Sequence, residues 1–195
     1  MGAMPEDALP LPPWPADAPS FGRVLLRPVS SSDTGMAMAL ATDPYVCDTG
    51  TLPLNAGEQE ALAWVKRQQG RHSEGRGFSF TIEEQLSGLA VGHCGLWLQH
   101  LAQGHASAGY AVVPQFRGRR FAADALAALT SFGWTVPGLQ RIELFIEPWN
   151  AASIRTAEHA GYAAAGMRRD YPLAGGERRD VRVYAARRPQ EQGAH

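Results

Sequence analysis

Apolar residues recur at two different spacings along the chain, and each spacing predicts one kind of element. From residue 141 to 146, Ile142, Leu144 and Ile146 alternate with residues of the opposite face, which is the period-two pattern of a strand. From residue 122 to 134, apolar residues stand at positions i, i+3, i+4 and i+7, which favours a helix with one buried stripe. The alternation of these patterns predicts a domain of the α/β (α+β) class.

The same reading, extended over the chain and bounded by turn residues, predicts a mixed sheet of six or seven strands with about four helices. The expected strands cover residues 24–28, 78–82, 89–99, 105–113, 141–146, 163–170 and 178–187, and the expected helices cover residues 32–41, 57–72, 122–134 and 150–161. We expect one globular domain over residues 21–188.

The two ends of the chain depart from this pattern. Residues 1–20 are rich in Pro, Ala and Asp, which is typical of an extended N-terminal arm, and we expect Trp14 in this arm to pack on the body of the domain. Residues 189–195 are expected to form a flexible tail.

Composition narrows the function classes. The chain has 195 residues, 45% hydrophobic and 19% charged, and a formal net charge of −1, which gives no electrostatic reason to expect nucleic acid or an anionic membrane as a partner. No apolar run is long enough to span a bilayer, and the N-terminus lacks a signal-peptide pattern. Cys47 and Cys94 are the only cysteines, and no Cys/His spacing resembles a zinc site. We therefore expect a cytoplasmic protein with free thiols and no metal.

One segment combines several features of a phosphate site. A strand ends at Val113, an Arg/Gly-rich loop follows, and a helix begins near Ala122. Unpaired amides and the dipole at a helix N-terminus both favour an anion, and Gly118 lets backbone approach a phosphate closely. Arg117, Arg119 and Arg120 add positive charge. The alternative is a solvated basic loop at a helix entry.

The chain also carries a series of short motifs in a fixed order. Gln115, Gly118 and Arg120 occupy the Q, first G and second G/A positions of an R/Q-x-x-G-x-G/A motif, Asn150 and Ser153 match N-x-x-S, and Glu158, Gly161 and Tyr162 match E-x-x-G-[FY]. In the order and spacing of these motifs, over about residues 22–188, the chain resembles the GNAT acetyltransferase superfamily. It looks most like the branch of ribosomal-protein N-terminal acetyltransferases.

The resemblance implies the GNAT fold, in which two parallel central strands splay apart to receive the pantetheine arm of acetyl-CoA or a related acyl-CoA. The implied strands cover residues 105–113 and 141–146, and the backbone of Ala111, Val112 and Val113 is expected to bind pantetheine as an added strand would. The resemblance also implies a set of residues around the phosphates and the thioester: Arg117, Gly118, Arg119, Arg120, Phe121, Ala122, Asn150 and Ser153.

Two residues depart from the family pattern. Arg120 stands where the family usually has Gly or Ala, so its side chain either crowds the pyrophosphate or turns outward to pair with a CoA phosphate. Ala157 stands where many members have a tyrosine that protonates the departing thiolate. In the N-x-x-S branch a serine lies near the thiol, which makes Ser153 the implied hydroxyl donor. The structural alternative for Ser153 is a first-turn position beside an Asn150 cap.

Acyl transfer to an amine requires a group that accepts the amine proton. Glu147, at the end of the strand that borders the gap, is the first candidate. His93 is the second, since imidazole titrates in the useful range, although a lone histidine on a strand is commonly structural.

The sequence thus predicts an N-acyltransferase that acts on a peptide N-terminal α-amine or on a small-molecule amine. A binding module that senses acyl-CoA without turnover is the alternative, and a homodimer stays open. A nucleotide-binding regulator fits less well, because the only lysine, Lys66, lies outside the loop and no Walker motif is present.

Overall fold

A computed structural model describes residues 11–174 and 176–190 of the chain. The described residues form one eight-stranded sheet with the spatial order β1-β2-β3-β4-β5-β6-β8-β7. The strands are β1 (Ser20–Phe21), β2 (Val24–Pro28), β3 (Gly77–Glu84), β4 (Ala90–Trp97), β5 (His105–Val112), β6 (Arg141–Ile146), β7 (Ala163–Pro172) and β8 (Arg178–Arg187). The helices are α1 (Thr34–Leu40), α2 (Pro44–Thr49), α3 (Glu58–Gly70), α4 (Phe121–Gly133) and α5 (Ala151–His159).

The predicted α/β class, the mixed sheet and the splayed central strands are confirmed. All seven predicted strands and all four predicted helices are present. The bounds of β2, β6 and β8 are as predicted, and those of the other elements shift by one to a few residues. The sequence reading lacked β1, which has two residues, and α2, which has six. Neither is long enough to show a periodic pattern.

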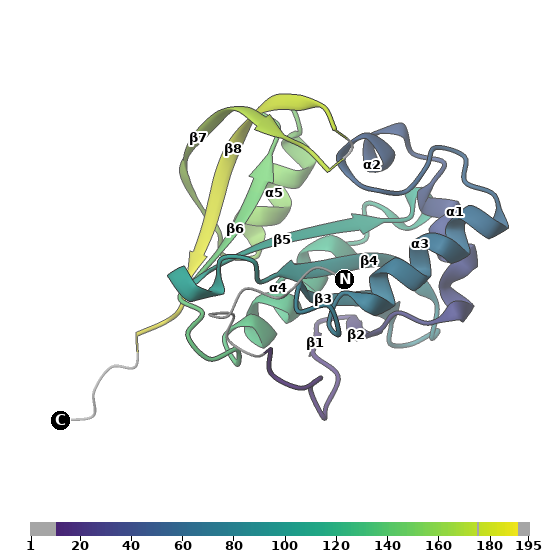
Figure 1. Cartoon of the computed structure of the whole chain (residues 1–195), viewed down its shortest axis with the longest axis horizontal. Coiled ribbons are helices and arrows are strands. Elements are labelled where there is room, and N and C mark those ends of the chain that lie inside the picture. The colour runs from purple at the N-terminus through teal and green to yellow at the C-terminus, as the bar shows by residue number, and fades with distance from the viewer. Residues whose placement is uncertain (1–10, 175, 191–195) are drawn as a thin grey trace.

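The only parallel pair in this sheet, β5 with β6, separates soon after it begins. The two strands are paired at His105–Arg141, Ala106–Ile142 and Ser107–Glu143. Beyond Ser107, β5 stays paired with β4 as far as Val112, whereas β6 beyond Glu143 stays paired with β8. The strands therefore diverge and leave a gap in the middle of the sheet (Figure 1).

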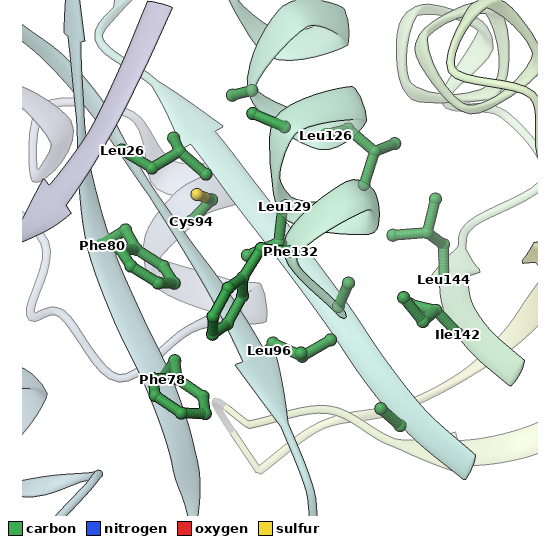
Figure 2. Packing of buried hydrophobic residues seen from close by; sticks show 14 of the residues in the cluster. Leu26, Phe78, Phe80, Cys94, Leu96, Leu126, Leu129, Phe132, Ile142 and Leu144 are labelled. Carbon is green, nitrogen blue, oxygen red and sulfur yellow. The ribbon is translucent and has the colours of Figure 1, made fainter. Parts of the chain in front are cut away.

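The main core lies between the sheet and α4. Phe132 on α4 packs beside Phe78 and Phe80 on β3, whereas Leu126 lies toward Leu144 of β6, as Figure 2 shows. Phe132 contacts both phenylalanines edge-on, at ring-centroid distances of 4.8 and 5.4 Å. The helix stripe predicted from residues 122–134 is thus the face that α4 buries.

A second core forms where α1 and α3 cover the opposite face of β3 and β4. The polar residues of β3 point to this side and are buried there: Ser79 donates to Gln68 at 3.2 Å, and Thr81 donates to Asp33 at 2.8 Å. Asp33 also accepts two bonds from Arg27, at 2.7 and 2.9 Å. Burial alone would raise the pKa of Asp33, but these bonds hold it below its ordinary value.

The described part of the N-terminal arm runs back over the body, as predicted for Trp14. The Trp14 ring contacts Phe78 and Phe80 at centroid distances of 5.2 Å each, and His72 at 5.4 Å. The first ten residues of the predicted arm and residues 191–195 of the predicted tail lie outside the described residues. Within the described part, no helix has the length and apolar character needed to cross a membrane.

Candidate active site

The loop between β5 and α4 has the backbone geometry expected of a phosphate site. Gly118 has φ +75°, and no atom lies within 4 Å of the place where its Cβ would stand, so the space in front of it is open. At the start of α4, the amide of Asp124 donates to the carbonyl of Arg120 and is the first amide after Arg117 with a protein acceptor. Within the described residues, the amides of residues 118–123 have no such acceptor. This loop therefore fits an anion.

The departure at Arg120 has a backbone explanation. Arg120 is the N-cap of α4 and has φ +68°, in the left-handed region where residues with a Cβ are disfavoured. A preference for Gly at this position is then partly a conformational preference. The Arg120 side chain is exposed and forms no ion pair within the described residues, so it is free to meet a phosphate.

The other loop residues have different surroundings. The Arg117 guanidinium donates through Nε to the carbonyl of Val112 at 3.0 Å and through Nη2 to the carboxylate of Asp43. The Arg119 guanidinium lies over the ring of Phe116, 5.8 Å from its centroid. Phe121 is buried in the main core, so only its amide faces the loop. All three arginines are exposed, but Arg117 is hydrogen-bonded to protein, whereas the side chains of Arg119 and Arg120 form no hydrogen bond or ion pair within the described residues.

Strand register places Glu147 across the gap from Ala111. Ser107 and Glu143 are the last partners of β5 and β6, and side chains of paired residues share one face of a sheet. Four residues further along each strand are Ala111 and Glu147, which therefore lie on that same face at the two borders of the gap. An acyl group that passes through the gap would therefore lie between Ala111 and Glu147.

Glu147 is buried, with 4% of its surface exposed, although the end of a strand is commonly solvated. Its Oε1 accepts from Arg179 of β8 at 3.0 Å and from the indole of Trp149 at 3.3 Å. Its Oε2 is buried without any partner in the described protein. A buried carboxylate oxygen without a partner is uncommon and indicates a place for a ligand or water.

His93 holds the other buried polar side-chain atom without a partner among the described residues, its Nε2. His93 is paired with Ala111 and thus shares the face of Glu147, on the β4 side of the gap. Its ring packs edge-on against Trp64 of α3 at a centroid distance of 4.9 Å. Burial lowers the pKa of His93 to about 3, so the imidazole is neutral near pH 7 and a weak base.

Ser153 lies in the first turn of α5. Its amide donates to the side chain of Asn150 at 3.0 Å, so Asn150 caps the helix as predicted. The carbonyl of Ser153 accepts from the hydroxyl of Tyr110 at 3.4 Å, and no bond to its own hydroxyl is present in the described protein. Ala157, at the slot of the missing tyrosine, is fully buried in the main core.

Three further residues line this region without having been selected from the sequence. Tyr45 of α2 contacts Trp149 edge-on at 5.0 Å between centroids. Arg179 joins Glu147 to Asp48 of α2, which lies 3.7 Å away. Tyr110 reaches from β5 to α5 across the gap. Tyr110 belongs to the strand predicted over residues 105–113 and was within reach of sequence reasoning, but Tyr45 and Arg179 become neighbours of Glu147 only through folding.

Metal ligands of the usual kinds are not gathered at this site. In residues 11–174 and 176–190, no group of three or more His, Cys, Asp or Glu side chains is placed to hold a metal ion.

Comparisons with known proteins agree with this geometry. A family model described as an acetyltransferase (GNAT) domain matches residues 23–163. A protein described as an uncharacterized N-acetyltransferase, p20 of Bacillus licheniformis, is 26% identical over 163 residues, which cover 84% of this chain and 92% of that protein.

Solved structures agree as well. Mycobacterium smegmatis RimJ, in complex with CoA-disulfide, has a TM-score of 0.72 and 25% identity, and the match covers 91% of this chain and 87% of that one. An acetyltransferase (GNAT family) from Bacillus anthracis has a TM-score of 0.72 and 19% identity, over 87% and 98% of the two chains.

Proposed function

The chain belongs to the GNAT acetyltransferase family, and from this premise we propose that it transfers an acetyl or other short acyl group from acyl-CoA directly to a peptide N-terminal α-amine. An acyl-CoA-dependent N-acetyltransferase activity follows from the family and from relatives of that name. The direct attack and the kind of acceptor are our proposals. Cys47 and Cys94 are free thiols, which is in keeping with the cytoplasmic location that we propose.

The observation that carries the mechanism is the place of Glu147. Its carboxylate lies at the border of the gap, with one oxygen held by Arg179 and the other unpartnered. We assign to this carboxylate the removal of the amine proton, directly or through a water molecule. The bond from Arg179 to Oε1 fixes the orientation of this carboxylate.

The residues around the cofactor have separate tasks in this proposal. Gly118, Arg119, Arg120 and the amides through Ala122 bind the phosphates, and the backbone of β5 from Ala111 to Val113 orients the pantetheine arm. The thioester of acyl-CoA supplies the activated acyl group. Ser153, whose position Asn150 fixes, donates its hydroxyl proton toward the departing sulfur.

The proposed acceptor is an α-amine because the two candidate bases are single residues. Glu147 has one oxygen, Oε2, without a partner among the described residues, and burial lowers the pKa of His93 to about 3. An α-amine has a pKa of about 7.7–8.0, whereas a lysine ammonium has one of about 10.4. Obtaining the neutral form of lysine costs about 3 kcal/mol more. A partly neutral α-amine is therefore the acceptor that this site is best suited to activate.

A competition assay tests the acceptor. The enzyme receives acetyl-CoA with equal amounts of two peptides, one with a free N-terminus and an acetylated lysine, and one with the reverse. We expect acetylation of the first peptide to dominate, with mass spectrometry as the measurement. A preference for the lysine peptide contradicts the proposal. If neither peptide is modified but a small-molecule amine is, the acceptor is a small molecule and the proposed peptide acceptor is wrong.

Two variants assign the roles in that assay. Glu147→Gln and Ser153→Ala are each expected to lower kcat by about 10² to 10⁴-fold, the usual range of general acid–base catalysis, with acetyl-CoA affinity retained. Thr156→Ala, one turn below Ser153 on α5, is the matched control for the serine. Normal turnover with lower stability in Ser153→Ala would show that the residue serves the helix alone.

The same assay separates an enzyme from a sensor. A module that binds acyl-CoA without turnover releases no CoA thiol with any amine. Family membership and the names of relatives favour the enzyme.

A further inference from the structure

The short helix α2 lies between two parts of the site. One is the loop between β5 and α4, residues 113–120, called the cofactor loop. The other is the side of the gap where Glu147 lies, called the acceptor side. At its start, Asp43 accepts from the amide of Tyr45 through Oδ1, at 2.8 Å, and from Arg117 of the cofactor loop through Oδ2. Further along, Tyr45 contacts Trp149, and Asp48 lies near Arg179. One helix thus connects a loop residue 74 positions away to the surroundings of Glu147.

Arg117 is built into this connection from both sides. Its Nε binds the carbonyl of Val112 at the end of β5, and its Nη2 binds Asp43. Burial alone would raise the pKa of Asp43, but the bonds from Arg117 and from the Tyr45 amide lower it, so the carboxylate is ionised near pH 7. A planar guanidinium suits two bonds in fixed directions, which lysine cannot reproduce.

Contacts within α2 alone do not fix its position. The helix has six residues, and none of them is buried. Isolated helices of this length are unstable, so its position depends on contacts with the rest of the protein. Half-buried Val46 packs against the second core, and other residues hold the two ends of the helix. At the N-terminal end, the charged contact is the one between Asp43 and Arg117.

We propose that Arg117 is a positioning residue that holds α2 against the acceptor side of the active site, and that it does not bind a CoA phosphate. The proposal rests on the function proposed above and deepens it. The loop that takes the cofactor would also set the wall of the acceptor site through Asp43, Tyr45 and Asp48. Cofactor and acceptor binding would then be coupled, because both depend on one loop.

The test separates positioning from phosphate binding by the direction of its effects. Asp43→Asn keeps an oxygen that caps α2 but removes the charge that holds Arg117. We expect acceptor KM to rise about 3- to 10-fold, in line with the loss of a partly exposed charged hydrogen bond. We expect kcat and the acetyl-CoA dissociation constant to change less than about twofold. Arg117→Met is expected to match Asp43→Asn, and the double variant to be no worse.

A phosphate-binding role for Arg117 predicts the opposite pattern. Asp43→Asn would then free the arginine and tighten acetyl-CoA binding, whereas Arg117→Met would weaken it, and either result overturns the proposal. No change of acceptor KM in either variant also overturns it.

The control is a second ion pair of equal exposure. The side chains of Arg23 and Glu84 are 49% and 13% exposed, against 47% and 14% for Arg117 and Asp43. Glu84→Gln makes the same kind of change at β3 and is expected to leave acceptor KM unchanged. An equal rise of KM in Glu84→Gln would show a general effect of charge and contradict the proposal.

A readout without turnover keeps this proposal distinct from the proposed function. Hydrogen exchange of the amides of residues 44–49 is expected to be faster in Asp43→Asn and in Arg117→Met than in the parent protein or Glu84→Gln. If no amine is acetylated, the proposed function fails, and the exchange rates and the acetyl-CoA affinity still decide the role of Arg117. Unchanged exchange overturns the proposal.

Discussion

At the scale of single residues, His93 and Glu147 show how burial gives similar candidates different roles. Both flank the gap, and each has a buried atom without a partner in the described protein. Glu147 has a cationic neighbour, Arg179, whose Nη1 lies 3.0 Å from Oε1. The His93 ring packs against the ring of Trp64, and burial lowers the pKa of His93 to about 3. We therefore assign proton transfer to Glu147 and a structural role to His93.

The pH dependence of stability tests this assignment. The pKa of His93 is about 3 in the folded protein and about 6.5 in an unfolded chain. Between these values the unfolded state binds an extra proton, so stability falls as pH decreases below about 6.5, by up to about 1.4 kcal/mol per pH unit. His93→Gln is expected to flatten this dependence between pH 6 and 4 in urea unfolding, and to retain most of kcat at pH 8.

If a folded His93→Gln variant loses turnover while the pH dependence of its stability is unchanged, His93 takes part in catalysis and the structural assignment is wrong. Asp33 supplies an internal reference. Its folded pKa is lowered, so its contribution is present above about pH 4 and is lost only at lower pH, as pH falls through the folded value. The two contributions therefore fall in different pH ranges.

Sequence reasoning reached those site residues that carry their own local signal. Asn150 and Gly118 were readable because a cap and a left-handed glycine are properties of a few adjacent residues. The partners of Arg117 and Glu147 were not, because Asp43 and Arg179 stand 74 and 32 positions away. Such pairs follow from the course of the whole chain and not from any motif.

At the scale of elements, the cofactor loop depends on two left-handed positions, Gly118 and Arg120, which are separated by one residue. Gly118→Ala is expected to destabilise the protein by about 1 kcal/mol, because a Cβ is disfavoured at this φ, although the space around it is open. If the amides bind phosphate, the acetyl-CoA dissociation constant should rise about tenfold, as measured by calorimetry.

Gly138→Ala is the matched control, since Gly138 has φ +79° and equally open surroundings but lies in the turn after α4. It should lower stability equally and leave acetyl-CoA affinity unchanged. Equal affinity in both variants and the parent protein would remove the cofactor loop from the site.

The burial of each element explains which of them could be predicted from the sequence. The stripe of α4 and the alternation of β6 reflect burial against a large surface, so their patterns are strong. The helix α2 has no buried residue and therefore no stripe to detect. Its cap, Asp43-Pro44, was the one local signal, since Asp before Pro is typical of a helix start.

At the scale of the whole molecule, the described part of the arm, from residue 11 on, packs on the core. Trp14 covers the end of the aromatic cluster around Phe78 and Phe80, and His72 Nε2 lies 2.8 Å from the carbonyl oxygen of Pro12. Trp14→Ala is expected to lower the free energy of unfolding by about 2 kcal/mol, less than for a fully buried aromatic because Trp14 is half-buried.

The free energy of unfolding is measured by urea denaturation followed by circular dichroism. Trp149→Ala is the control, since Trp149 is 64% exposed. Acetyl-CoA affinity should be unchanged in Trp14→Ala. A stability equal to that of the parent protein would mean that the arm is dispensable for the fold.

The divergence of β5 and β6 also bears on self-association. A sheet normally has free edges only at its two ends, where a strand of another molecule is able to pair and start aggregation. Here the divergence adds two free edges in the interior, beyond Ser107 on β5 and beyond Glu143 on β6. The two edges diverge from their last paired residues, so next to that point the gap is too narrow to take a further strand at the usual spacing of about 4.8 Å from each neighbour. The unpaired backbone groups of both edges nevertheless stay available to hydrogen-bond with a slender ligand.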